Sequence, residues 1–181
     1  MLVQTYIAIL RGINVGGHTK IKMSDLKSAM EESGFSNVST YIQSGNIFFS
    51  TAVSSREDLS MRISALIKNR FGADVPVIIR SQRELREILK NSPFLGDPDI
   101  DTTKLHVTFL SGVPGPSVMA NFSRSKYLPD QFSIRSSDVY LYCPNGYGRT
   151  KLTNGFFEKT LRLNATTRNW RTVGKLAGPQ K

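Results

Sequence analysis

The stretch TYIAILRGINVGGHTK, residues 5–20, decides the fold expected at the start of the chain. Its first part, residues 5–10, contains an apolar run from Tyr6 to Leu10 and is typical of a buried strand. Its second part carries three glycines among arginine, asparagine, histidine and lysine side chains. Glycine lets the backbone take positive φ and lets a ligand approach the peptide N–H groups closely. Cationic and amide side chains beside such a backbone suit an anion, most often a phosphate.

The same loop comes close to the phosphate-loop pattern G-x-x-x-x-G-K-[ST], but His18 stands where that pattern requires a lysine. A mostly neutral histidine cannot replace a lysine that reaches the β- and γ-phosphates. The helix expected next is capped by Ser24, beyond the loop rather than inside it. An NTPase is therefore not expected. Two alternatives stay open: a general anion-accepting loop, and a turn that needs glycine for backbone geometry alone.

Outward from this stretch, the expected elements follow the order β-α-β-β-α-β. In the first half they are a strand at 5–10, a helix from Ser24 to Gly34, strands at 38–42 and 47–50, a helix from Ser55 to Gly72, and a strand at 75–80. A helix capped by Ser81 and Glu84 and a turn-rich connector at 93–101 follow.

The order then restarts. The second set is a strand at 105–110, a short helix at 116–122, strands at 132–135 and 139–142, a helix capped by Thr153, a strand at 163–165, and a helix at 168–177 with Thr167 as N-cap. We expect an α+β protein made of two degenerate ferredoxin-like β-α-β-β-α-β units, a degenerate duplication, with a C-terminal helix. The units span 1–91 and 92–181, side by side or packed into one compact body.

Composition sets the broad class. The chain has 181 residues, of which 39% are hydrophobic and 21% charged, as in folded globular proteins. No apolar run approaches the ~18 residues of a membrane span, and the first residues do not resemble a signal peptide. Cys143 is the only cysteine, which excludes an internal disulfide and a thiolate cluster. We expect a cytoplasmic protein with no membrane contact, no cofactor and no metal site.

Charge points to an anionic partner. The formal net charge is +10, and residues 139–181 carry eight basic residues against one acidic residue, Glu158. Such an excess favours nucleic acid or anionic small molecules. On the last helix, Arg168, Arg171 and Lys175 share helical spacing and form an expected basic face, with Trp170, Val173 and Ala177 packed inward.

Three polar loops supply the candidate site. They are the glycine loop, the hairpin tip at 43–46, and the basic loop at 147–154 that leads into a helix N-terminus, where anions sit well. We expect the residues of these loops to form one composite anion site. The first candidates are Arg11, Asn14, Gly16 and Gly17; the second are Gln43, Ser44, Asn46, Lys151, Asn154 and Arg168.

Four motifs give the chain a resemblance to a known family. They are LRGINVGG at 10–17, YIQSGNI at 41–47, KLTN at 151–154 and ATTRNW at 165–170. In this order, across nearly the whole chain, they resemble the bacterial family "domain of unknown function 1697". The resemblance implies a pair of ferredoxin-like units and carries no catalytic residues with it.

The expected function is the binding of a phosphorylated or carboxylated small molecule at the composite site. The alternative is a nucleic-acid-binding module that uses the basic C-terminal surface. His106 lies within an apolar strand, where a packed and hydrogen-bonded ring is expected. The sequence contains no recognisable carboxylate pair, thiol–imidazole pair or metal set. Whether the protein is an enzyme, and its oligomeric state, therefore stay open.

Overall fold

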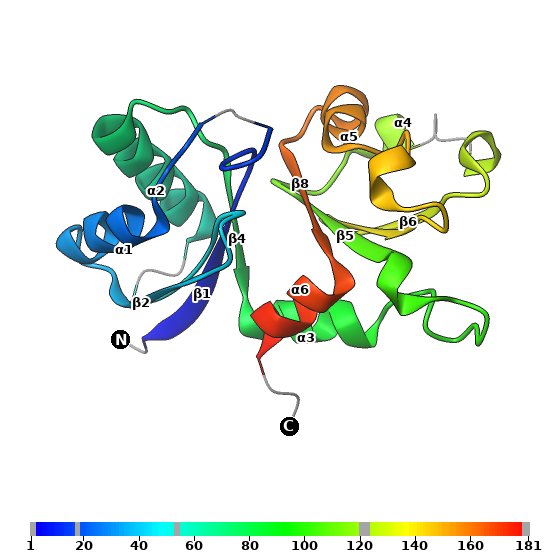
Figure 1. The fold of residues 1–181 in the computed structure, drawn as a ribbon, viewed down its shortest axis with the longest axis horizontal. Helices are drawn as coiled ribbons and strands as arrows, with labels where there is room; N and C mark the ends of the chain where they lie inside the picture. The colour runs from blue at the N-terminus through cyan, green and yellow to red at the C-terminus, as the bar shows by residue number, and fades with distance from the viewer. Residues whose placement is uncertain (1–2, 17–18, 53–54, 120–123, 179–181) are drawn as a thin grey trace. The chain divides into compact units, whose positions relative to one another are not determined.

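The computed structural model describes residues 3–16, 19–52, 55–119 and 124–178 (Figure 1). Within them the chain forms two four-stranded antiparallel sheets and six α-helices. It divides into two compact units, Met1–Glu84 and Leu85–Lys181. The division lies inside helix α3 (Gln82–Lys90), whereas the expected units, 1–91 and 92–181, keep that helix with the first.

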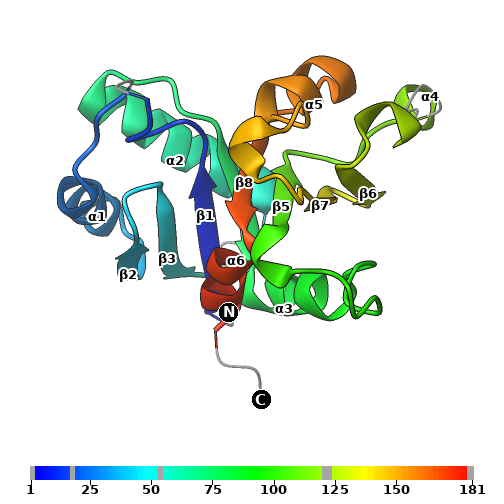
Figure 2. The same ribbon diagram turned by 45° about the vertical axis from the view of Figure 1, so that its right-hand side comes forward.

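The first unit places two helices on one side of its sheet (Figure 1, Figure 2). The strand order is β2-β3-β1-β4, and all neighbours are antiparallel. The elements are β1 (Gln4–Leu10), α1 (Met23–Glu32), β2 (Ser36–Tyr41), β3 (Asn46–Thr51), α2 (Arg56–Phe71) and β4 (Val77–Ser81).

Strand β1 lies inside the first sheet and is buried on both faces. Tyr6, Ala8 and Leu10 belong to the core shared with α1 and α2, while Ile7 and Ile9 are fully buried on the alternate positions. Successive strand residues point to opposite faces. A strand covered on both faces therefore reads as a continuous apolar run rather than an alternating one, as residues 6–10 do.

The second unit repeats the strand order, as β6-β7-β5-β8. Helices α4 and α5 cover one face of this sheet, and α6 packs on β5 and β8 (Figure 1). The strands are β5 (Leu105–Leu110), β6 (Gln131–Arg135), β7 (Asp138–Tyr142) and β8 (Ala165–Asn169). The helices are α4 (Pro116–Met119), α5 (Asn154–Leu161) and α6 (Trp170–Ala177), with short 3-10 turns η1 (Thr102–Lys104), η2 (Arg124–Tyr127) and η3 (Tyr147–Arg149).

Three of the expected helix caps are confirmed. The Ser55 hydroxyl accepts from Asp58 N, and the Thr153 hydroxyl accepts from Phe156 N. Ser81 and Glu84 form a reciprocal box, because each side chain accepts from the other's backbone N–H. These caps satisfy N–H groups that the first turn of a helix cannot pair by itself.

Two expected helix starts were wrong. Helix α1 begins at Met23, so Ser24 lies inside it, and the N-cap residue Lys22 makes no side-chain cap. The C-terminal helix begins at Trp170 and not at Arg168, because residues 165–169 pair with β5 as strand β8. The β-branched Thr166 and Thr167 suit a strand, and Asn169 caps the helix by accepting from Thr172 N at 2.8 Å.

The expected basic face of the last helix is therefore smaller. Arg168 belongs to β8 and is buried, which leaves Arg171 and Lys175 exposed on α6. The buried residues of α6 are Thr172, Val173, Leu176 and Ala177, so Trp170 is only partly covered. The end of the short helix expected at 116–122, residues 120–122, lies outside the described residues. Among the helices described, none is long and apolar enough to cross a membrane.

The single cysteine gives a testable consequence of this packing. Cys143 is fully buried, and burial raises the pKa of its thiol to about 11, aided by Asp130 and opposed by a hydrogen bond with Thr150. Because the thiolate is the reactive form, we expect the folded protein to react with a thiol reagent at about pH 8 at least ~100-fold more slowly than the unfolded chain. Labelling rates with and without denaturant measure this difference, and equal rates would contradict it.

Candidate functional site

In the first unit, the glycine loop and the hairpin tip lie side by side. Leu10 N donates to Gly45 O at 2.8 Å. The Asn14 carboxamide donates to Gln43 O at 2.9 Å and to Ile21 O at 2.8 Å. Its Oδ1 accepts from Ile21 N at 2.9 Å. The Asn14 side chain thus links its own part of the loop to Ile21, where the loop ends, and also to the hairpin tip at Gln43.

The backbone of this loop uses the left-handed region repeatedly. Gly12, Asn14 and Gly16 have φ of 70°, 53° and 62°. Asparagine tolerates this region better than most residues with a side chain, so Asn14 suits the position by backbone as well as by hydrogen bonding. Gly17 and His18 lie outside the described residues.

The other polar residues of this region differ in exposure. Asn46 is fully buried, and its amide donates to Tyr41 O at 3.1 Å and to the Ser44 hydroxyl at 3.3 Å. Arg11 and Ser44 are half-buried, and Gln43 is exposed. Asn14 and Asn46 thus hold the loops through their hydrogen bonds, while Gln43 is exposed to solvent.

In the second unit, a network of hydroxyl groups meets at Thr167 on β8. Its Oγ1 lies 2.6 Å from Asn154 Oδ1, 2.7 Å from the Thr108 hydroxyl and 3.0 Å from the Tyr147 hydroxyl. The Asn154 oxygen can only accept, so Thr167 donates its single proton there. Thr167 must then accept from both Thr108 and Tyr147. The direction of every hydrogen bond in the network is therefore determined.

This network orients Asn154, the first residue of α5. With Oδ1 held by Thr167, the side-chain NH₂ is left without an acceptor in the described part of the chain. The backbone N–H groups of Asn154 and Gly155 likewise have no acceptor there, because the Thr153 cap takes only Phe156 N and its carbonyl only Phe157 N. Three donor groups thus gather at the positive end of the helix dipole.

The basic candidates of this unit lie in different settings. Lys151 is exposed three residues before Asn154, and Arg149 is exposed in the same loop. Arg168 follows Thr167 on β8, so its Cβ points to the opposite face. Its Nη1 donates to Thr166 Oγ1 and Thr167 O, both at 2.9 Å. Burial lowers the pKa of Arg168 to about 10, and the guanidinium stays charged at neutral pH.

His106 has the packed, hydrogen-bonded ring expected of it. The ring stacks on Tyr147, with centroids 4.9 Å apart and planes at 26°. Nδ1 lies 3.1 Å from Lys104 O, so this nitrogen carries the proton. Burial lowers the pKa of His106, and the ring is neutral at pH 7.

Thr108 and Thr167 are the members of the network that sequence reasoning missed. Thr167 was expected to be a helix cap, and Thr108 was treated as part of an apolar strand. The sequence signal that could have indicated the network is a threonine on each of two strands, β5 and β8. Nothing local indicates that those strands pair at these two residues. In the residues that the structure covers, no group of three His, Cys, Asp or Glu side chains is placed to hold a metal ion.

Comparison with known proteins identifies the family. Residues 3–140 match the family described as "Protein of unknown function (DUF1697)", and the chain belongs to it. The resemblance drawn from the sequence motifs is confirmed, and two of those motifs, at 151–154 and 165–170, lie beyond the matched range. The comparison with curated proteins found no match.

A solved structure shares the fold. The conserved bacterial protein SP0830 from Streptococcus pneumoniae is similar over 97% of this chain and 98% of its own, with a TM-score of 0.76 and 21% sequence identity. At this identity the likeness concerns the fold alone.

Proposed function

We propose that the protein binds an anionic small molecule, phosphorylated or carboxylated, at the start of helix α5. The observation that carries the proposal is a set of donors with no acceptor among the described residues: the Asn154 side-chain NH₂ and the backbone N–H groups of Asn154 and Gly155. Lys151 adds an exposed positive charge three residues earlier in the chain. Backbone donors at a helix N-terminus, together with a lysine, recur in phosphate-binding sites.

Preorganisation supports this location over the rest of the basic surface. Thr167 holds the Asn154 carboxamide in one orientation, and Thr153 caps the same turn. A ligand would therefore meet donors that are already ordered, which lowers the entropy cost of binding. By contrast, the buried Arg168 guanidinium donates to Thr166 and Thr167 of its own strand. We assign it no part in the proposed contact.

The proposal is tested with inorganic phosphate, titrated into the full chain at constant ionic strength and followed by the rise in melting temperature. The informative variant is Asn154→Asp. It keeps an oxygen for the Thr167 hydroxyl but replaces the NH₂ donor with a negative charge. We expect it to weaken phosphate binding by at least ~10-fold while the fold stays intact, because a carboxylate is favourable in the first turn of a helix.

Lys151→Ala has a matched control in Lys159→Ala, since both remove one exposed charge from the region of α5. We expect the first variant to weaken phosphate binding and the second to leave it within about twofold. Equal effects of the two variants would indicate that phosphate responds to a diffuse basic surface rather than to one site. A diffuse basic surface is what the alternative, nucleic-acid binding, would use, and its affinity would fall steeply with salt. An unchanged response in Asn154→Asp would exclude the proposed site.

The first unit supplies a further location for the same class of ligand. We propose Arg11, Gly16 and Gln43 as its contacts, with Ser44 at the edge. Asn14 and Asn46 act there as positioning residues, because the Asn14 amide ties the glycine loop to the hairpin tip and the Asn46 amide holds the two arms of the hairpin. Arg11→Ala, assayed with phosphate beside Asn154→Asp, separates this location from the one at α5.

We also infer that the two units are degenerate copies of one ferredoxin-like β-α-β-β-α-β unit. Beyond the shared strand order, Arg80 and Arg168 occupy corresponding places on β4 and β8. Both are buried, and the Nη1 of each donates to the carbonyl of the residue before it at 2.9 Å. In each case the next residue, Ser81 or Asn169, caps the following helix by accepting from the N–H three residues on.

A further inference from the structure

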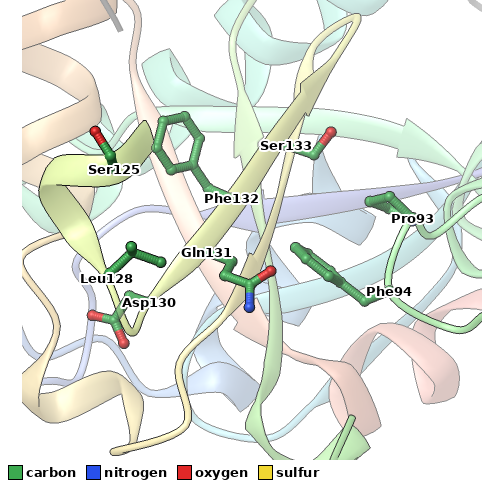
Figure 3. Close-up of a pocket in the computed structure, with 8 residues that line it drawn as sticks. All are labelled: Pro93, Phe94, Ser125, Leu128, Asp130, Gln131, Phe132 and Ser133. Carbon is green, nitrogen blue, oxygen red and sulfur yellow. The ribbon is translucent and has the colours of Figure 1, made fainter. Parts of the chain in front are cut away.

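A cavity of about 320 Å³ lies in the second unit, and its described lining includes none of the residues proposed above to bind the anion. Its walls come from the loop after α3, from the segment that includes η2, and from β6, which is an edge strand of its sheet (Figure 3). The volume falls at the lower end of the range for small-molecule sites. The lining residues are Pro93, Phe94, Ser125, Leu128, Asp130, Gln131, Phe132 and Ser133.

The walls divide into apolar and polar parts. Leu128 and Phe94 approach from opposite sides, with Gln131 between them and Asp130 beside Leu128 (Figure 3). Phe94 is buried and its ring packs against Tyr142 at 6.2 Å, so this wall is anchored in the unit. Leu128 is 68% exposed and borders the opening. An apolar ligand body thus has surfaces on two sides.

The polar wall has unused hydrogen-bonding capacity. Asp130 is held in place by its backbone N–H, which donates to Tyr127 O at 2.9 Å. Its carboxylate, and the carboxamide of Gln131, make no hydrogen bond or ion pair within the described residues. Among the described residues that line the cavity, Asp130 is also the sole ionisable one, in a chain with a net charge of +10. The charge that these described residues give the lining is therefore opposite in sign to that of the protein as a whole.

We propose that this cavity binds a small organic amine, as an ammonium ion carried on an apolar or aromatic body. The ammonium pairs with the Asp130 carboxylate and donates to the Gln131 oxygen, and such charged hydrogen bonds are the stronger ones. The carbon body packs between Phe94 and Leu128, where the Phe94 ring also favours a nearby cation. Because the chain as a whole is basic, the attraction for a cation at this cavity comes from the Asp130 carboxylate itself.

The test uses 2-phenylethylamine with the full chain, followed by saturation-transfer NMR and by shifts of backbone amide signals. We expect roughly millimolar binding, with shifts at residues 128–133 and at Phe94. The carboxylate 3-phenylpropanoate, similar in size and opposite in charge, should not produce them. Asp130→Asn should weaken amine binding at least ~10-fold, whereas Asp99→Asn, which changes the net charge equally at an exposed site, should not.

Gln131→Lys provides a second variant, which we expect to keep the fold because Gln131 is exposed on an edge strand. The new lysine places its own ammonium beside Asp130, so 2-phenylethylamine should no longer shift the backbone amide signals of residues 128–133. Absence of amine binding to the natural chain, equal loss in Asp99→Asn, or equal binding of the carboxylate would each overturn the proposal. None of these outcomes depends on whether phosphate binds at α5.

Discussion

Gly45→Ala is expected to destabilise the first unit by about 3 kcal/mol. Gly45 has a φ of 81°, where a side chain is strained. A Cβ there would lie 2.8 Å from Ile13 Cδ1 and 2.8 Å from Leu10 Cβ, so the hairpin tip would have to move away from the glycine loop. The hydrogen bond from Leu10 N to Gly45 O would be disturbed as well.

Thermal unfolding measures this effect, with an expected fall of roughly 6–12 °C in melting temperature. Gly12→Ala is the matched control, because Gly12 has a similar φ of 70° but no atom of the described residues within 4 Å of an added Cβ. It should cost only the backbone strain, about 1 kcal/mol. If both variants melted alike, the close packing of the two loops would be contradicted.

Phe157→Ala is expected to destabilise the second unit by about 3–5 kcal/mol. Phe157 is fully buried on α5. Its ring packs edge-on against Phe132 on β6, at 6.2 Å and 70°, and against Phe156, at 5.2 Å and 71°. Removal of the ring therefore opens a cavity beneath the helix that carries the proposed anion site.

Urea unfolding of the variant measures the loss, alongside two comparisons. Phe157→Leu retains most of the volume and should lose less than about 1.5 kcal/mol. Phe156→Ala truncates a neighbour that is only partly buried, so its cost should be smaller than that of Phe157→Ala. Equal losses of unfolding free energy in Phe156→Ala and Phe157→Ala would contradict the packing of α5 on the sheet through Phe157.

Local patterns predicted most of the fold. The capping residues Ser55, Ser81 and Thr153 were identified correctly because a cap depends on residues within three or four positions. The same reasoning failed at Thr167 and Arg168, where pairing with β5 overrides the local preference for a helix start. Strand pairing joins residues far apart in sequence, so no pattern near residue 167 reveals it.

The sequence by itself determined the order of elements, the family, the excess of positive charge and the places where glycine or asparagine allows positive φ. These follow from side-chain chemistry and from neighbours within one helical turn or one strand. Tertiary structure decided which polar groups have partners. It brought Asn14 to Gln43 and Thr167 to Asn154, and it buried Arg168. Hydrogen-bond partners depend on the packing of distant segments to within a few tenths of an ångström, and only the folded chain sets those distances.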